Sequence, residues 1–357
     1  MLSIGIVGLP NVGKSTLFNA LTKSKQADAQ NYPFCTIEPN VGVVEVPDSR
    51  LEQLVSTSSS LKAIPTAIEF WDIAGLVKNA SQGEGKGNAF LSNIKETDAI
   101  AHVVRGFHND NIIHVENRVD PSDDAAIINL ELALADAQAV ESRLDKTKKK
   151  LKGSASKDIK EEVALLERLA LHLNEGHPAR ALEYTEDEQL IMNELHLLTQ
   201  KPMMYIVNVD DAQMTGSEQL IVEEGCVHIY VSAKTESELS DLSAEDAAMF
   251  MEELGVSESG LDRIVKGGYE LLKLVTFFTS GEQESRAWTV QQGTTAPYAA
   301  GVIHTDFIKG FIKADVAKTE DFVAAGGWGG MKGTGNLRLE GKDYQVQDGD
   351  VCYFHIN

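Results

Sequence analysis

The first residues whose types and spacing could do chemistry are 8–16, which read GLPNVGKST. An apolar run, 3–7, precedes them and predicts a buried strand, and the LFNALT that follows has helical character. In the pattern G-x-x-x-x-G-K-[ST], glycines let backbone N–H groups turn inward around phosphate oxygens, and the helix N-terminus adds its positive field. Lys14 can reach the β- and γ-phosphates, and the Ser15 hydroxyl can bind Mg²⁺. We therefore predict a nucleoside triphosphate site in which Lys14 is also catalytic and the phosphates are held by Asn11, Val12, Gly13, Lys14, Ser15 and Thr16.

Further parts of such a site follow along the chain. A strand predicted over 69–73 carries Asp72, and Gly75 stands three residues later. An Asp in this position supports Mg²⁺, and the glycine N–H can bind the γ-phosphate. Thr36, in the loop NYPFCTIEP, can complete the metal shell while the γ-phosphate is present, which is how switch loops sense hydrolysis. The predicted metal ligands are therefore Ser15, Thr36 and Asp72. The glycine-rich run 80–87 is either a second switch or an ordinary flexible loop.

The stretch MMYIVNVDDA, 203–212, predicts a buried strand that ends near Asn208. Asn and Asp often do no more than start a turn. Here, however, Asn208 and Asp211 have the spacing of the guanine-reading Asn-Lys-x-Asp element of GTPases, with Val209 in place of the lysine. A later predicted strand ends in Ser232-Ala233-Lys234, like the loop that covers the base in those proteins. We therefore predict that the base is contacted by Asn208, Val209, Asp211, Ser232, Ala233 and Lys234.

Composition narrows the class of protein. The chain has 357 residues, a net charge of −22 and 43% hydrophobic residues, enough for two or three domains with cores of their own. Its acidity argues against general coating of nucleic acid, which needs surplus Lys and Arg. No apolar run approaches a membrane span, and the N-terminus lacks a basic leader, so we expect no membrane partner. Three distant cysteines predict neither a disulfide framework nor a zinc site, and they favour a cytoplasmic location.

Two segments outside the nucleotide motifs have patterns of their own. Apolar residues at heptad spacing predict two helices forming an antiparallel coiled-coil hairpin, and the spaced residues are Leu130, Leu134, Ala137, Leu144 and Leu151, then Ile159, Val163, Leu166, Ala170 and Leu173. Five lysines, between Lys146 and Lys152, lie at its predicted tip, either as a solvated helix end or as a basic finger for a partner. Near the C-terminus, 344–346 and 351–355 flank Asp348-Gly349 and predict a pair of strands.

Taken in order, GLPNVGKST, NYPFCTIEPN, DIAGL and ASQGEGKGNAFLSNIKETDAI resemble the Obg-like ATPase (YchF) family over essentially the whole chain. The resemblance implies an α/β P-loop NTPase sheet, resembling a G domain, with an inserted coiled-coil hairpin and a C-terminal ubiquitin-like (TGS) β-grasp domain. The domain boundaries we expect are 1–121 and 199–280 for the nucleotide-binding domain, 122–198 for the insertion and 281–357 for the TGS domain. The resemblance also implies binding to the ribosome, with the large subunit as the suspected partner and the lysine tip and TGS domain as contacts.

The family resemblance also bears on catalysis. Leu76 occupies the position where many GTPases have a water-orienting glutamine. The resemblance suggests His114 instead, since a neutral histidine can orient water and relay a proton near pH 7, although a packed structural histidine is an equal reading. Asn11 resembles a position that helps to bind K⁺ in related enzymes, so K⁺ joins Mg²⁺ as a candidate cofactor.

Base preference is the point at which this chain departs from the family, which binds ATP through Asn-x-x-Glu. Asp211 stands where the glutamate is expected, and a carboxylate at the right distance accepts two hydrogen bonds from guanine. We expect ATP to be favoured over GTP, with a GTP-specific GTPase as the alternative. A nucleotide-sensing module with negligible hydrolysis is a second alternative, and a small-molecule kinase is disfavoured.

Overall fold

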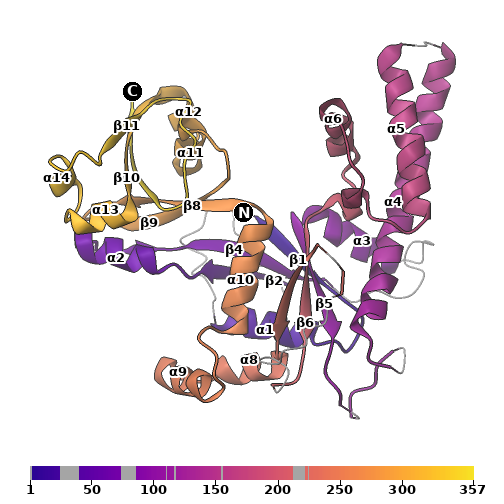
Figure 1. Ribbon diagram of the computed structural model, residues 1–357, viewed down its shortest axis with the longest axis horizontal. Coiled ribbons are helices and arrows are strands. Elements are labelled where there is room, and N and C mark those ends of the chain that lie inside the picture. The colour runs from indigo at the N-terminus through magenta and orange to yellow at the C-terminus, as the bar shows by residue number, and fades with distance from the viewer. Residues whose placement is uncertain are drawn as a thin grey trace.

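A computed structural model describes residues 2–24, 40–73, 86–109, 111–115, 118–153, 156–211, 222–223 and 225–357. Thr36, Gly75, Leu76 and most of the glycine-rich run 80–87 lie outside the described residues. Two sheets organise the rest, and a long helical hairpin projects from the first at the opposite end of the molecule from the second (Figure 1).

The first sheet is mostly parallel, in the order β2-β4-β1-β5-β6-β7. Of its described strands, β2 alone runs antiparallel, beside β4. The strands are β1 (Ser3–Val7), β2 (Val41–Val46), β4 (Thr66–Asp72), β5 (Ala99–Arg105), β6 (Met203–Asn208) and β7 (Val227–Val231). All residues of β1, β5 and β6 are buried, as expected for central parallel strands covered on both faces. Because β1, β4, β5, β6 and β7 are parallel, their carboxyl ends lie along one edge, where ligands bind in such sheets.

Helices flank this sheet and follow its strands. They are α1 (Lys14–Ser24), α3 (Lys86–Glu96), α8 (Ala233–Leu239), α9 (Ala244–Glu253) and α10 (Gly260–Leu271). The strands predicted at 3–7 and 203–207, and the helix predicted after the glycine loop, are confirmed.

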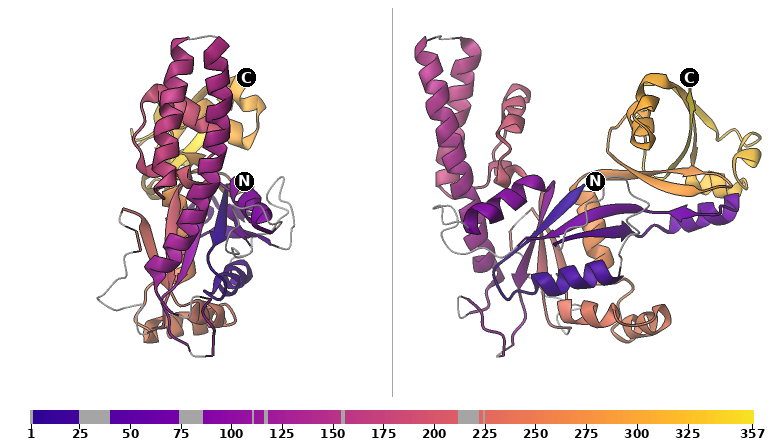
Figure 2. Two further views of the ribbon diagram at one scale, coloured as in Figure 1. Left: turned by 90° about the vertical axis from the view of Figure 1, so that its right-hand side faces the viewer. Right: turned by 180° about the vertical axis from the view of Figure 1, so that it is seen from behind.

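The insertion forms the predicted antiparallel helix pair, α4 (Pro121–Gly153) and α5 (Lys157–Asn174), whose two helices stand side by side in Figure 2. Its core contains Ala133, Ala137, Val140, Leu166 and Leu169. The predicted seam of the first helix is partly wrong, since Leu130 is 48% exposed while Ala133 and Val140 are buried in its place. A straight helix drifts away from a strict seven-residue spacing, and here α6 (Glu186–Leu195) also packs on the pair.

The second sheet has the order β11-β10-β12-β8-β9-β3. Its strands are β3 (Ala63–Ile64), β8 (Leu274–Ser280), β9 (Ser285–Gln291), β10 (Phe311–Lys318), β11 (Arg338–Glu340) and β12 (Asp350–Ile356), and its helices are α11 (Ala296–Ile303), α12 (Asp306–Gly310), α13 (Thr319–Ala324) and α14 (Trp328–Met331). The strand predicted at 351–355 is present, but the predicted partner at 344–346 is wrong. Gln345 makes only an isolated bridge to Thr295, and β12 pairs with β10 and β8 instead.

Residues 49–64 lie between two strands of the first sheet but pack on the second. Leu51 and Leu54 of α2 (Ser49–Ser58) join a core with Phe278 and Phe322, and β3 pairs with β9. β8, which begins at Leu274, is likewise a strand of the second sheet.

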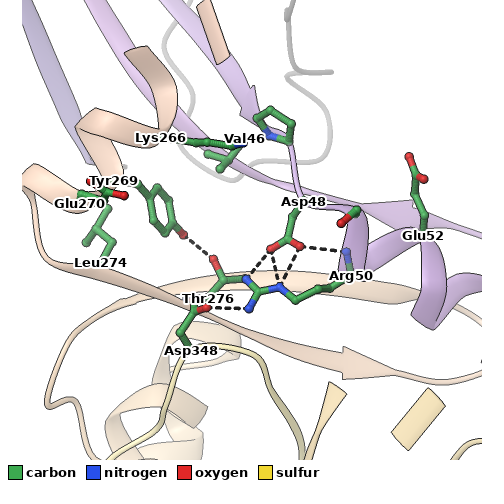
Figure 3. Close-up of a pocket in the computed structure, with 12 residues that line it drawn as sticks. Val46, Asp48, Arg50, Glu52, Lys266, Tyr269, Glu270, Leu274, Thr276 and Asp348 are labelled. Carbon is green, nitrogen blue, oxygen red and sulfur yellow. Dashed lines mark hydrogen bonds and ion pairs between the residues drawn. The ribbon is translucent and has the colours of Figure 1, made fainter. Parts of the chain in front are cut away.

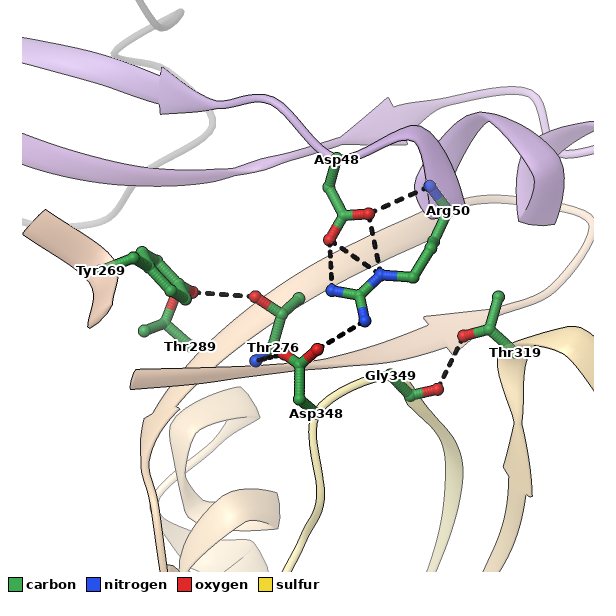
Figure 4. A network of polar contacts seen from close by, with 8 residues as sticks. All are labelled: Asp48, Arg50, Tyr269, Thr276, Thr289, Thr319, Asp348 and Gly349. Carbon is green, nitrogen blue, oxygen red and sulfur yellow. Dashed lines mark hydrogen bonds and ion pairs between the residues drawn. The ribbon is translucent and has the colours of Figure 1, made fainter. Parts of the chain in front are cut away.

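One arginine spans the junction between the two sheets. Asp48 lies two residues after the end of β2, and its carboxylate accepts hydrogen bonds from Nε and Nη2 of Arg50 (Figure 3). The Nη1 of Arg50 donates to Asp348 Oδ2 at 2.6 Å. Asp348 also accepts from the Thr276 N–H at 2.8 Å, so the contact continues into β8 (Figure 4). These contacts therefore hold the segment that leaves β2, at the start of α2, against β8 of the second sheet.

Candidate functional site

The glycine loop between β1 and α1 has the backbone shape of a phosphate cradle. Asn11 has φ 63° and Gly13 has φ +103°, so the loop curls back on itself before the helix begins. A Cβ added at Gly13 would lie 2.3 Å from Asn208 Nδ2, which explains why this position is glycine. Lys14 is buried, and its Nζ donates to the Leu9 carbonyl oxygen at 2.8 Å across the loop. The Lys14 side chain thus closes the loop over the N-terminus of α1.

Burial lowers the pKa of Lys14, and the nearby charge of Asp72 offsets this only in part. The charged form of a buried lysine is stabilised when a phosphate adds further negative charge beside it. The electrostatics of the loop therefore favour a polyphosphate ligand.

The two described members of the predicted metal set lie in contact. Ser15 Oγ donates to Asp72 Oδ2 at 2.9 Å, because α1 begins beside the carboxyl end of β4. A hydroxyl and a carboxylate are the hard oxygen donors that Mg²⁺ prefers when phosphate oxygens and water complete its shell. Among the described residues no cluster of three His, Cys, Asp or Glu side chains could hold a metal on its own. The residues present thus fit Mg²⁺ arriving with a nucleotide.

Asn208, predicted to contact the base, has a structural task that sequence reasoning missed. Its Nδ2 donates to the Val12 carbonyl at 2.9 Å, and its Oδ1 accepts from the Ala233 N–H at 2.9 Å. The side chain is buried at the end of β6. Asn208 therefore ties the phosphate loop to the Ser232-Ala233-Lys234 loop, whatever contact it also makes with the base.

Asp211 is held by the same second loop. Its carboxylate accepts a hydrogen bond from the Thr235 hydroxyl, and Ser232 forms a further side-chain hydrogen bond. Burial alone would raise the pKa of Asp211, but these bonds and the charge of Lys234 outweigh it and lower the pKa. Asp211 therefore stays ionised at neutral pH, with part of its hydrogen-bonding capacity already used by the protein.

A cavity of about 800 Å³ lies between these elements at the carboxyl edge of the sheet. Nine predicted residues line it, namely Asn11, Gly13, Thr16, Asn208, Val209, Asp211, Ser232, Ala233 and Lys234. Its volume suits a nucleotide. Phe107, Asn109 and Ile112 also line it, and sequence reasoning missed them. The available signal was that GFHN, 106–109, directly follows a buried parallel strand and so had to lie at the same edge.

His114, the candidate catalytic histidine, does not line this cavity. It is buried, and its Nε2 lies 2.9 Å from Asp124 Oδ2 in the first turn of α4. Burial raises the pKa of Asp124, and the bond to His114 opposes that rise. The preceding residue, Ile113, accepts a hydrogen bond from Asn11 Nδ2 at 3.1 Å, so the histidine lies next to the phosphate loop without lining the cavity.

This fold and site define a P-loop NTPase of the GTPase type, with a helical insertion and a C-terminal domain. A family model described as "50S ribosome-binding GTPase" matches residues 3–131, and the YchF-GTPase C-terminal model, described as a protein of unknown function (DUF933), matches 274–357. Over its whole length the chain is also 52% identical to a relative named YchF, so it belongs to the YchF family.

Individual relatives match over their full length. The chain is 52% identical to the ribosome-binding ATPase YchF of Bacillus subtilis, over 100% of this chain and 99% of the relative. It is 51% identical to the protein of that name from Escherichia coli O157:H7, over 99% and 98%. The solved YchF GTPase of Schizosaccharomyces pombe superposes with a TM-score of 0.89 at 38% identity, covering 99% of this chain and 97% of that one.

Proposed function

We propose that this chain is a Mg²⁺-dependent ATPase that binds the ribosome and whose binding responds to the nucleotide it carries. The observation that carries the proposal is the full-length similarity to relatives named ribosome-binding ATPase, at 52% and 51% identity. The arrangement of Lys14, Ser15 and Asp72 supports it, because this chain has kept the groups that hold a triphosphate and its metal.

In this proposal Lys14 neutralises charge on the β- and γ-phosphates, while the loop amides fix their position. Ser15 and Asp72 would hold Mg²⁺, together with Thr36, and Mg²⁺ supplies charge neutralisation to the phosphates when bound. His114 is the candidate for orienting water, and to do so its ring would have to leave Asp124. Intrinsic hydrolysis is therefore expected to be slow. Asn11, beside the phosphates, is the proposed contact for K⁺.

ATP is the proposed base choice. Guanine is read by a carboxylate that accepts from N1–H and N2–H₂ together, and adenine presents no such donor pair. The Asp211 carboxylate is already engaged by hydroxyls of Thr235 and Ser232, which lowers its capacity for that double bond. GTP is the second candidate, favoured by the one observation that Asp211 is ionised and lies at the cavity wall.

The proposed ribosomal contact is the tip of the hairpin, with the C-terminal domain as a second contact and the large subunit as partner. Lys146, Lys149 and Lys150 are exposed there, while Lys148 pairs with Glu167 at 2.7 Å. Local positive charge can steer a polyanion even on an acidic protein. No helix in the described part of the chain is long and apolar enough to cross a membrane. We place the protein in the cytoplasm, where its proposed partner lies.

Two measurements test this function. Side-by-side calorimetric titrations of ATP and GTP at matched Mg²⁺ and K⁺ should show tighter ATP binding, and tighter GTP binding would transfer the proposal to a GTPase. Single-turnover hydrolysis with purified ribosomes and K⁺ should consume the bound ATP. Nucleotide that stays intact for hours would leave a nucleotide-sensing binding module, and phosphate transfer to an added small acceptor would indicate a kinase.

A further inference from the structure

The loop that follows β5 forms one wall of the nucleotide cavity and is organised from within by Arg105. This arginine is the last residue of β5 and is only 2% exposed. Its Nε donates to the Phe107 carbonyl at 3.2 Å, Nη1 to the Ile112 carbonyl at 3.0 Å, and Nη2 to the Asn109 carbonyl at 3.2 Å. One side chain thus gathers three carbonyl groups from the loop.

The three residues whose carbonyls bind Arg105 are also the three loop residues that line the cavity. A carbonyl that points at the guanidinium cannot point into the cavity, so Arg105 decides which groups of Phe107, Asn109 and Ile112 face a ligand. The guanidinium carbon also lies 4.4 Å from the centre of the Phe107 ring, which fixes that ring from one side. The planar fork of donors makes arginine suited to holding several acceptors in one geometry.

The loop has further ties to both other walls of the cavity. The His108 N–H donates to Asp210 Oδ2 at 3.3 Å, beside the segment that carries Asp211. The Asn11 side chain donates to the Ile113 carbonyl at 3.1 Å, next to the carbonyl that Arg105 holds. The position of the loop therefore depends on its bonds to Arg105, on the bond from Asn11 of the glycine loop and on the bond to Asp210.

We infer that Arg105 is a positioning residue that shapes the base end of the nucleotide cavity by holding Phe107, Asn109 and Ile112 in place. The inference rests on the proposed nucleotide function and deepens it. Arg105 acts through the loop, and the phosphate cradle is built by other residues. Its loss should therefore weaken recognition of the base and ribose and leave recognition of the phosphates largely intact.

The test is a pair of calorimetric titrations, of ATP and of inorganic tripolyphosphate, both with Mg²⁺, on wild type, R105M and R105K. In R105M the Kd for ATP should rise about tenfold or more, because part of the binding free energy of ATP is then used to order the loop after β5. The Kd for tripolyphosphate should change less than about twofold, because other residues build the phosphate cradle and binding there does not require the loop to be ordered. R105K retains a charge that can reach one or two of the carbonyls, and its ATP affinity should lie between the other two. In hydrolysis assays of R105M, KM for ATP should rise by a larger factor than kcat falls.

R180M is the control, since Arg180 is an arginine with an 18% exposed side chain that binds Glu223, and neither residue lines the cavity. It should lose stability yet keep the wild-type Kd for ATP. Wild-type ATP affinity in R105M would overturn the inference, and so would equal weakening of ATP and tripolyphosphate. If R105M does not fold, R105K decides between the same outcomes. Failure of the wild-type chain to bind ATP would overturn the proposed function and this inference together, whereas tight binding by R105M overturns the inference alone.

Discussion

Ser15 and Asp72 are 57 residues apart in the chain, and the Ser15 hydroxyl donates a 2.9 Å hydrogen bond to the Asp72 carboxylate. The two proposed oxygen ligands for Mg²⁺ are therefore in contact, one on the first turn of α1 and one at the end of β4.

The contact predicts that D72N abolishes most Mg²⁺-dependent hydrolysis. Asparagine keeps an oxygen but removes the negative charge, and metal stabilisation of phosphoryl transfer is worth several kcal/mol, so the rate should fall at least about a hundredfold. The measurement is single-turnover hydrolysis across a Mg²⁺ titration. D187N, on the exposed start of α6, is the control and should behave as wild type. Equal rates for D72N and wild type would remove Asp72 from the metal site.

The buried Lys14 predicts a pH dependence of stability. Its pKa is lowered from 10.5 in the folded protein, chiefly by burial, and keeps its ordinary value in the unfolded chain. As pH rises from the lowered pKa towards 10.5, the folded state releases its proton first, so the free energy of unfolding increases. Urea unfolding of the nucleotide-free protein should therefore show wild type gaining stability relative to K14M over that window. Saturating ATP should reduce the gain, because phosphate stabilises the charged lysine. A difference that falls with pH would contradict the assignment.

Asn208 predicts a coupled loss of stability and binding. N208A would leave the Val12 carbonyl and the Ala233 N–H without their Asn208 partners in a buried site, a cost of about 2–4 kcal/mol in unfolding free energy. ATP affinity should fall as well, because Asn208 no longer links the glycine loop to the Ser232-Ala233-Lys234 loop. Denaturant midpoints and calorimetric titrations measure the two effects. N193A, on an exposed face of α6, serves as control. Wild-type stability of N208A would show that Asn208 does not hold the two loops together.

Arg50 predicts that the two sheets unfold together. R50A removes the ion pairs to Asp48 and Asp348 and the contact with the Phe278 ring, 5.2 Å away. Because the group is partly exposed, the melting temperature should fall by only about 1–3 °C. The sharper expectation is that calorimetry resolves a separate transition for the C-terminal domain. R338A removes an ion pair within that domain, to Asp350, and should leave a single transition. Two transitions in wild type would mean that Arg50 does not couple the sheets.

The hairpin tip predicts salt-dependent binding to ribosomes. The double variant K149E/K150E should bind ribosomes more weakly, and the slope of log K against log salt should become shallower by about one for each phosphate that is no longer neutralised. Cosedimentation at several salt concentrations measures this. K23E/K95E carries the same change in net charge at exposed positions outside both the hairpin and the C-terminal domain. Equal weakening of ribosome binding by both double variants would indicate a general effect of net charge and exclude specific binding through the hairpin tip.

The sequence by itself determined the parts of the site that are local in the chain. Glycines that permit positive φ, a lysine and a hydroxyl at the start of a helix require only a short consecutive stretch, and the structure contains them as expected. The order of strands along the chain also placed Asp72, Asn208 and Ser232 at one edge, because parallel strands share a carboxyl side.

Only the tertiary structure decided which side chains meet across that edge. The binding of Asn208 to Val12 joins residues 196 apart, and no local pattern encodes it. Arg105 and His114 bind partners 2 to 10 residues away, but the path of the loop after β5 brings them together and no sequence pattern states that path. The two-residue strand β3 has no periodicity to detect, and it joins the second sheet because β9 offers it an edge to pair with. The predicted partner of β12 was wrong for a related reason, since β10 pairs along most of one edge of β12 and β8 occupies the other edge. Pairings between distant segments depend on the geometry of the whole sheet, and a single sequence does not state that geometry.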